Sequence, residues 1–327
     1  MGDSFAPLVV QPPYFRFIER RVEKPVIAAI ELMLRTTIKR VKPGRVGVEG
    51  VRRITATLDG RLGKADKAAR ITRQQCDQVP CEWLDVPGSR ADRVILYLHG
   101  GAFAFRLPRL QTAMVARWCR ALGARALMPR YRLAPEHPFP AGPDDCLAAY
   151  RWLLEHCGDP RRIVIAGDSA GGNLTLVTLQ RARDAGLPLP AAAICLSPAV
   201  DFSLSGRSAV VNEDADPIFT AKLLRWFGEL YLTEPDLFTN PLVSPLIGDF
   251  SDLPPLLFQV GTKEMLLDDS TRAAAKAHAS GVVVQLDVFD RMPHVFQAIP
   301  QYAETPIADA HLFEFLSLHA HWNRRDA

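Results

Sequence analysis

A serine flanked by small residues is the feature of this sequence with the clearest chemistry. Ser169 stands in Gly167-Asp168-Ser169-Ala170-Gly171, after the apolar run 163–166 and before a segment with helical spacing. A G-x-S-x-G turn between a strand and a helix is so sharp that larger side chains beside the serine would collide with the neighbouring elements. The turn lifts the hydroxyl to the edge of the sheet, where it can act as a nucleophile toward a carbonyl carbon.

A second feature lies upstream, where two glycines follow another apolar run. The segment His99-Gly100-Gly101-Ala102-Phe103 comes directly after Tyr97-Leu98. Glycines at this place can leave backbone N–H groups free to face a developing oxyanion, and removing one such donor typically lowers a rate by about 10²–10³. We interpret His99 as a structural residue of this loop. The sequence thus predicts an oxyanion-binding loop together with a nucleophile.

Strand-like and helix-like segments alternate from about residue 81 onward and would position both features. Short apolar runs are separated by longer segments with helical periodicity, which predicts right-handed βαβ units and a mostly parallel sheet covered on both faces. The expected strands are 94–99, 124–129, 162–166, 191–196, 255–260 and 282–289, and the expected helices are 110–122, 143–157, 171–185, 268–280 and 305–323.

Two regions do not fit this alternation, and we interpret both as cap segments. Residues 1–75 contain an amphipathic helix at about 14–41 and then a segment rich in Arg, Lys and Gly, and residues 203–245 contain a helix at 220–232. We expect both to cover the carboxyl edge of the sheet, where ligands bind in open α/β sheets. The core would then be formed by residues 76–202 and 246–327.

The motifs together resemble the hormone-sensitive-lipase family of esterases, bacterial family IV. The resemblance covers about residues 80–300 and rests on four motifs: His99-Gly100-Gly101-Ala102-Phe103, the segment 131–141 (YRLAPEHPFPA), Gly167-Asp168-Ser169-Ala170-Gly171-Gly172-Asn173 and Met292-Pro293-His294-Val295-Phe296. It implies an α/β-hydrolase fold with an eight-stranded sheet and a helical cap formed partly by the N-terminus. It also implies hydrolysis of carboxylic esters with short to medium acyl chains.

The resemblance also implies which backbone amides bind the oxyanion. In the family pattern HGGGF, the second and third glycines act together with the residue after the serine, and the matching residues are Gly101, Ala102 and Ala170. Gly100, in the same turn, is a further candidate. Ala102 stands where the family has glycine. Because a backbone donor survives an added methyl group, we expect an intact oxyanion hole and a slightly narrower alcohol side.

The general base is expected at His294. It follows the last apolar strand and lies downstream of the serine, as the chain order of this fold requires. His294-Val295-Phe296 departs by one residue from the H-G-F of the family. Other histidines fit less well, because His137 precedes the serine and four more lie in predicted helices: His278, His311, His319 and His321.

The acid behind the histidine has two main candidates. The family pattern G-x-x-D-P-L-x-D matches the segment 261–268, and its first Asp, which orients the histidine, corresponds to Glu264. Either carboxylate can hold the imidazole tautomer if the loop absorbs one extra methylene group. Asp268, which matches the second Asp, is the alternative acid or else a cap for the helix that starts near it. Asp290, in the loop of the histidine, is a third candidate.

Composition narrows the partners and the location. The 39 basic and 36 acidic side chains leave a net charge of +3 without a basic block, so a nucleic-acid partner is not expected. The apolar stretch 26–34 is interrupted by Glu31 and is far shorter than the roughly 20 residues of a membrane span. The opening Met1-Gly2-Asp3-Ser4 lacks the pattern of a secretory leader. We therefore expect a cytoplasmic protein without stable membrane insertion, and a homodimer is one option for its assembly.

Cysteine usage and motif content bear on cofactors. The six cysteines are scattered without a C-x-x-C pair, which favours reduced thiols; the spacing of Cys76 and Cys81 also allows a bridge between them. The sequence has no metal-binding H-E-x-x-H, no phosphate loop and no dinucleotide fingerprint. We expect neither a metal nor a cofactor.

These residues predict a serine carboxylesterase that acts on small-molecule esters in two steps. Attack by Ser169 with His294 as base would form an acyl-enzyme, and water would release the acid. Two other functions use a similar site: a hydrolase of terpenoid-type lactones with the same triad, and a non-catalytic small-molecule-binding relative. The presence of His294 as a base argues against the non-catalytic relative. A substrate panel would distinguish the lactone hydrolase from a carboxylesterase.

Overall fold

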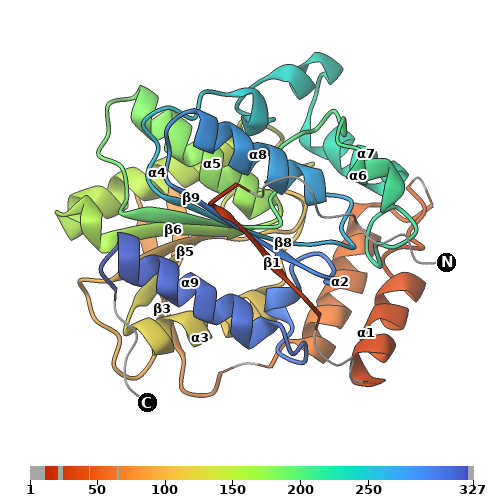
Figure 1. The fold of residues 1–327 in the computed structure, drawn as a ribbon, viewed down its shortest axis with the longest axis horizontal. Helices are drawn as coiled ribbons and strands as arrows, with labels where there is room; N and C mark the ends of the chain where they lie inside the picture. The colour runs from red at the N-terminus through yellow and green to blue at the C-terminus, as the bar shows by residue number, and fades with distance from the viewer. Residues whose placement is uncertain (1–11, 21–24, 44, 65, 323–327) are drawn as a thin grey trace.

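A nine-stranded sheet runs through the middle of the molecule (Figure 1), in the order β1-β9-β8-β7-β6-β4-β5-β3-β2. The computed structural model describes residues 12–20, 25–43, 45–64 and 66–322. The opening tetrapeptide used in the leader prediction and Asn323 lie outside these residues. Neighbouring strands are parallel, except that β3 pairs antiparallel with both β2 and β5.

The central strands are buried along their whole length, as expected for parallel strands covered on both faces. Their apolar runs are therefore continuous rather than alternating. The strands are β1 (Phe15–Ile18), β2 (Arg70–Cys76), β3 (Val79–Asp85), β4 (Val94–Leu98), β5 (Arg125–Pro129), β6 (Ile163–Asp168), β7 (Ala192–Leu196), β8 (Leu256–Gly261) and β9 (Val284–Phe289).

Helices cover both faces of the sheet (Figure 1). On one face, the helices α4, α5 and α8 pack against the sheet and contribute Leu147, Leu174 and Ala273 to one apolar cluster. On the other face, α3 and α9 contribute Met114 and Phe315 to a second cluster. The helices are α1 (Pro25–Thr36), α2 (Val48–Leu62), α3 (Pro108–Leu122), α4 (Ala141–Cys157), α5 (Ala170–Asp184), α6 (Ser208–Val211), α7 (Ala221–Tyr231), α8 (Leu267–Ala279) and α9 (Thr305–His319). Short 3₁₀ turns lie at Pro160–Arg162, Pro235–Thr239, Pro245–Ile247 and Phe296–Ala298.

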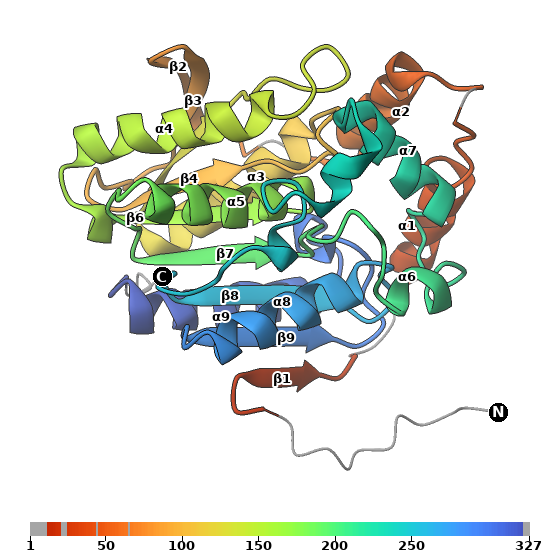
Figure 2. The ribbon, with the colours of Figure 1, turned by 90° about the horizontal axis from the view of Figure 1, so that it is seen from above.

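Four helices gather at the carboxyl ends of the parallel strands, which form one end of the molecule in Figure 2: α1, α2, α6 and α7. A third apolar cluster joins them to each other and to the sheet, and it includes Ile30 of α1, Leu58 of α2, Phe227 of α7 and Met292 beyond β9. Packing rather than helix propensity therefore holds these short amphipathic helices in place.

The N-terminal region differs from the sequence prediction. The helix expected at 14–41 is instead a strand, Phe15–Ile18, followed by the shorter helix Pro25–Thr36. Residues 15–18 form a strand because their backbone pairs with the edge of β9. The hydrophobic pattern of one segment does not contain this information about its pairing partner. This strand is the ninth where eight were expected. The segment 1–75 is consequently not cap alone, since β1 and most of β2 belong to the sheet.

The rest of the predicted alternation is close to what is observed. Each predicted strand and each other predicted helix lies within two residues of the observed bounds, except that the last helix ends at His319 rather than 323. The helix Val48–Leu62 and the hairpin of β2 and β3 were not predicted. All six cysteines are free thiols. Among the described helices, none has the length and apolar character needed to cross a bilayer.

Candidate active site

Ser169 lies at the strained turn between β6 and α5. Its backbone adopts φ 54° and ψ −119°, a conformation that costs an L-residue of order 1–3 kcal/mol and persists only where the surroundings enforce it. A Cβ atom on Gly171 would lie 1.9 Å from the carbonyl oxygen of Leu98, and one on Gly167 would lie 2.2 Å from that of Gly171. The Ser169 amide donates to the Leu196 carbonyl of β7 at 2.8 Å. The glycines are therefore required by the close approach of α5 to β4 at Gly171 and to β6 at Gly167.

Asp168 connects this turn to the loop after β4. Its buried carboxylate accepts a hydrogen bond from the Tyr97 hydroxyl and one from the Gly100 amide at 2.8 Å. Burial raises the pKa of Asp168 above its ordinary value, although the two hydrogen bonds oppose the shift. Asp168 thus anchors the elbow to the oxyanion loop.

The predicted oxyanion amides fall into two groups. Within the described ranges, the amides of Gly101, Ala102 and Ala170 donate to no other protein group. The Gly100 amide differs, because it is occupied by Asp168. The prediction that Gly100 is a further oxyanion donor is therefore wrong. Ala170 is the first residue of α5, where the helix dipole adds to the attraction for an anion.

The loop that carries Gly101 and Ala102 turns in the left-handed region. Gly101 has φ 122° and Ala102 has φ 51°, and the Gly101 carbonyl accepts from the amides of Ala104 and Phe105. A Cβ atom at Gly101 would lie 2.0 Å from the Phe105 carbonyl oxygen, so only glycine fits there. Ala102 accommodates its methyl group at some conformational cost, and this methyl group borders the cavity next to Ser169.

Arg52 of α2 fastens the cap to this loop. Its guanidinium donates to the carbonyl oxygens of Ala104 at 2.9 Å and Ala134 at 3.0 Å, and both of its terminal nitrogens bind Glu136 at 2.7 Å. The paired carboxylate of Glu136 raises the pKa of Arg52 further, so the guanidinium is charged at any relevant pH. Part of the unpredicted helix α2 therefore supports the oxyanion loop.

His294 and Glu264 form the buried pair behind the serine. The Nδ1 atom of His294 lies 2.9 Å from Oε2 of Glu264, which is fully buried. The other oxygen of Glu264 accepts from the Ser197 hydroxyl at 2.8 Å and the Gly261 amide at 2.6 Å. Burial would lower the pKa of His294, but the hydrogen bond and the charge of Glu264 outweigh it and raise the pKa above its ordinary value.

The other two candidate acids lie in different surroundings. Asp268 accepts from the Ser208 amide at 2.9 Å, while its own amide donates to the hydroxyl oxygen of Ser208 at 2.9 Å. It thereby joins α8 to α6. Asp290 lies 3.5 Å from the Thr262 hydroxyl and 3.8 Å from the guanidinium of Arg291. Of the three carboxylates, only Glu264 contacts His294.

Sequence reasoning missed Ser197, which bridges the loops of the acid and the base. Its hydroxyl donates to Glu264 and accepts from the Val295 amide at 3.2 Å. The residue directly follows β7, at the same edge of the sheet as Ser169, and has φ 46°. The position of Ser197, a polar residue directly after a buried parallel strand, was the sequence signal that could have indicated a role in the site.

The second cap segment, residues 203–245, is hydrogen-bonded to the loop that carries Glu264. Asn212 donates to the carbonyl oxygens of Glu264 at 2.7 Å and Thr262 at 3.0 Å, and Asp216 accepts from the Met265 amide at 3.0 Å. From the first cap segment, Glu31 pairs with Lys263 at 2.7 Å. Both cap segments therefore fix the loop that presents Glu264.

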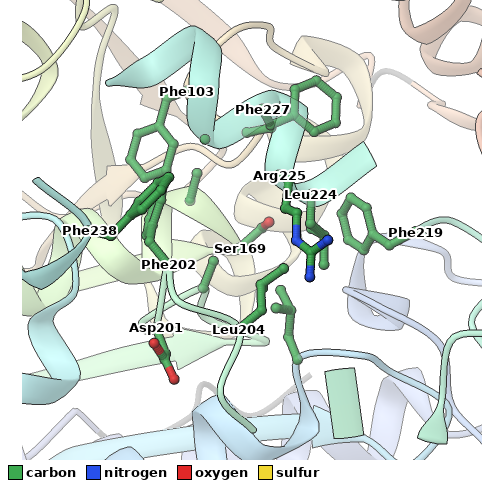
Figure 3. Close-up of a pocket in the computed structure, with 15 residues that line it drawn as sticks. Phe103, Ser169, Asp201, Phe202, Leu204, Phe219, Leu224, Arg225, Phe227 and Phe238 are labelled. Atoms are coloured by element: carbon green, nitrogen blue, oxygen red, sulfur yellow. The ribbon is translucent and has the colours of Figure 1, made fainter. Parts of the chain in front are cut away.

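Two cavities open beside Ser169 and share the side chains of Ala102, Phe219 and Phe227. The first, which we call the phenylalanine pocket, has a volume of about 570 Å³ (Figure 3). Its phenylalanines are Phe103, Phe202, Phe219, Phe227 and Phe238. The second, which we call the cap pocket, has a volume of about 920 Å³. It extends under α1 and α2 and is lined by Leu34, Ile38, Val51, Leu58 and His294, among others.

Phe219 lines both cavities and packs against the histidine. Its ring meets the imidazole of His294 edge to face, with the centroids 4.9 Å apart. Nothing among residues 12–20, 25–43, 45–64 and 66–322 groups three or more His, Cys, Asp or Glu side chains closely enough to hold a metal ion. The groups at hand are a hydroxyl, an imidazole, a carboxylate and unpaired amides, which suit acyl transfer.

Comparisons with known proteins agree on the family. A family model described as alpha/beta hydrolase fold matches residues 95–298. An acetyl-hydrolase of Streptomyces hygroscopicus is 38% identical over 267 residues, which is 82% of this chain and 86% of that protein. An esterase of Acinetobacter venetianus is 35% identical over 207 residues, or 63% of this chain and 68% of that protein.

Solved structures resemble the whole described fold. A crystal structure of an esterase from the bacterial hormone-sensitive lipase family is 40% identical, has a TM-score of 0.85 and covers 92% of this chain and all of that one. A hormone-sensitive lipase from a metagenome library is 34% identical, with a TM-score of 0.82 and coverage of 90% and 98%. These matches confirm the predicted α/β-hydrolase fold. The chain belongs to the hormone-sensitive-lipase-like family IV of bacterial esterases and is a carboxylic ester hydrolase.

Proposed function

We propose that the chain hydrolyses carboxylic esters through an acyl-enzyme on Ser169, with His294 as proton carrier and Glu264 as the acid that orients it. The observation that carries this proposal is the buried contact of 2.9 Å between Glu264 and Nδ1 of His294, in a cavity that Ser169 also borders. A carboxylate at Nδ1 fixes the proton on that nitrogen. The Nε2 atom then keeps its lone pair and can take the proton of the serine.

The reaction proceeds in two half-reactions. The Ser169 oxygen attacks the ester carbonyl as His294 takes its proton, and the amides of Gly101, Ala102 and Ala170 stabilise the oxyanion. The imidazolium then gives its proton to the departing alcohol. Water repeats the sequence on the acyl-enzyme and frees the acid, so the serine is regenerated. Glu264 stabilises the imidazolium in both halves, in line with the raised pKa of His294.

The two cavities suggest how the ester binds. The departing oxygen must be close to His294, and His294 lines the cap pocket but not the phenylalanine pocket. We therefore assign the alcohol to the cap pocket and the acyl chain to the phenylalanine pocket. An apolar acyl pocket bordered by five phenylalanine side chains favours short to medium chains. In this assignment the helices of both cap segments close the site over the substrate.

A panel of p-nitrophenyl esters from acetate to palmitate tests the proposal. We expect the highest kcat/KM between butyrate and octanoate, and a loss of nearly all turnover in Ser169→Ala. Wild-type rates in that variant would remove the proposed nucleophile. A maximum at palmitate would contradict the assignment of the acyl pocket. The cytoplasmic location and the homodimer stay predictions of the sequence.

A further inference from the structure

Arg225 places a positive charge at a pocket whose lining is otherwise almost entirely apolar. It projects from α7 and lines the phenylalanine pocket, where its guanidinium lies over the cavity beside Phe219 and Leu224 (Figure 3). The side chain is exposed. In the part of the chain that the structure describes, it forms neither a hydrogen bond nor an ion pair.

Among the described residues that line this pocket, Asp201 is the only other ionisable one, and its charge is already compensated. Its carboxylate accepts from the guanidinium of Arg272 at 2.7 Å and from the hydroxyls of Ser203 and Ser205. Burial would raise the pKa of Asp201, but these hydrogen bonds lower it below its ordinary value. Figure 3 shows the carboxylate at the far side of the pocket from Arg225. The pocket therefore presents one uncompensated positive charge.

We propose that Arg225 selects esters whose acyl part ends in an anionic group, with monoesters of dicarboxylic acids as the substrate class. This inference rests on the proposed function, because it needs the acyl chain in the phenylalanine pocket. The methylene groups of such an acyl chain would pack against the phenylalanine rings while the terminal carboxylate meets the guanidinium. A planar guanidinium binds a carboxylate through two parallel hydrogen bonds, and nearby apolar walls reduce the screening by water.

The size of the effect is limited by exposure. An ion pair at a solvent-accessible rim contributes modestly and weakens with salt. Removal of the charge is therefore expected to change the preference for an anionic ester by about three- to fivefold, the range that corresponds to exposed ion pairs. A matched control is Lys222, which lies on the same helix, is exposed and does not line the pocket.

The experiment compares two esters that differ only in charge. Monoethyl adipate carries a terminal carboxylate, and ethyl adipamate carries the isosteric neutral amide. Ethanol release is followed with a coupled alcohol dehydrogenase at 20 mM and at 500 mM NaCl, and the readout is the ratio of kcat/KM for the anionic ester to that for the neutral ester. We expect this ratio to fall about three- to fivefold in Arg225→Gln, to be partly kept in Arg225→Lys and to be unchanged in Lys222→Gln. In the wild type it should fall as salt rises.

Two results would overturn the inference. One is a ratio that Arg225→Gln leaves unchanged while ethyl adipamate is hydrolysed normally, which would leave the proposed function standing. The other is an effect of Arg225→Gln on kcat/KM that is confined to an ester with its anion on the alcohol side, such as carboxymethyl butyrate. That result would place the charge of Arg225 at the alcohol-binding cap pocket. Absence of wild-type turnover of ethyl adipamate and p-nitrophenyl butyrate would instead refute the proposed function itself.

Discussion

The replacement Glu264→Gln tests the most specific part of the proposed mechanism. It keeps the size of the side chain but exchanges the carboxylate that contacts Nδ1 of His294 for an amide. Glu264 is fully buried and also accepts from Ser197 and Gly261, so the oxygen of the new amide is expected to stay with these two donors. The amide NH₂ then faces the imidazole.

An NH₂ group at this place favours the wrong tautomer. Nδ1 must accept a hydrogen bond instead of donating one, so the proton moves to Nε2 and the imidazole can no longer take the proton of Ser169. The charge that stabilises the imidazolium is lost as well. A change of this kind lowers kcat by about 10³–10⁴, which corresponds to about 4–5.5 kcal/mol in the activation free energy.

Asp268→Asn is the matched control. It makes the same chemical change at the alternative acid, whose contacts are with Ser208 rather than with His294. An asparagine oxygen can still accept from the Ser208 amide, so we expect kcat to change by less than about threefold and stability by about 1 kcal/mol. Initial rates of p-nitrophenyl butyrate hydrolysis and urea unfolding curves measure both variants. If only Asp268→Asn abolished turnover, or if Glu264→Gln stayed within tenfold of the wild type, the assignment of the acid would be refuted.

Three further predictions concern the base, the oxyanion loop and the cap helix α2. The pH profile of kcat/KM should fall on the acid side with a midpoint above pH 6.5, because the pKa of His294 is raised and the protonated imidazole is inactive as a base. In Glu264→Gln, the midpoint of the residual activity should move to lower pH, because the carboxylate that raises this pKa is gone. Arg52→Gln should lower kcat by about tenfold or more, because it removes the hydrogen bonds that hold the oxyanion loop. The matched change Arg53→Gln, at the exposed neighbour, should leave kcat unchanged, and steady-state kinetics measure both variants. Gly60→Ala should stabilise α2 by about 0.5–1 kcal/mol in urea unfolding, because no atom lies within 4 Å of the added methyl group; an unchanged or lower midpoint would contradict this.

The part of the fold that local patterns can specify was predictable from the sequence. Strands such as Ile163–Asp168 are buried on both faces, so they are continuous apolar runs, and the helices between them begin and end at glycines and prolines. The strand Phe15–Ile18 was not predictable in this way. Four residues with a mixed pattern are extended because β9 offers a free edge, which is information about a partner about 270 residues away.

The candidate site shows the same division. Ser169 and His294 are marked by their motifs, and Glu264 by its place in a motif from which it departs in residue type. The choice between Glu264 and Asp268 depended on how the loop after β8 turns, and that turn is held by Asn212 and Asp216 from the cap. Contacts between distant segments of this kind leave no local signal.

The Gly100 amide and Ser197 illustrate the reason at the level of single hydrogen bonds. Gly100 belongs to the motif of the oxyanion loop, but its amide is taken by Asp168 from another strand. Ser197 belongs to none of the motifs, although its hydroxyl joins the acid to the loop of the base. Motifs identify residue types, whereas hydrogen-bond partners depend on the assembled sheet.

The most direct test of the central claim is the site at which a fluorophosphonate reacts. After incubation with an alkyl fluorophosphonate, intact-mass measurement should show one adduct per chain and complete loss of esterase activity, and peptide mapping should locate the adduct at Ser169. The Ser169→Ala protein should acquire no adduct. Inactivation with the label on another residue, or turnover by Ser169→Ala at the wild-type rate, would contradict the acyl-enzyme mechanism.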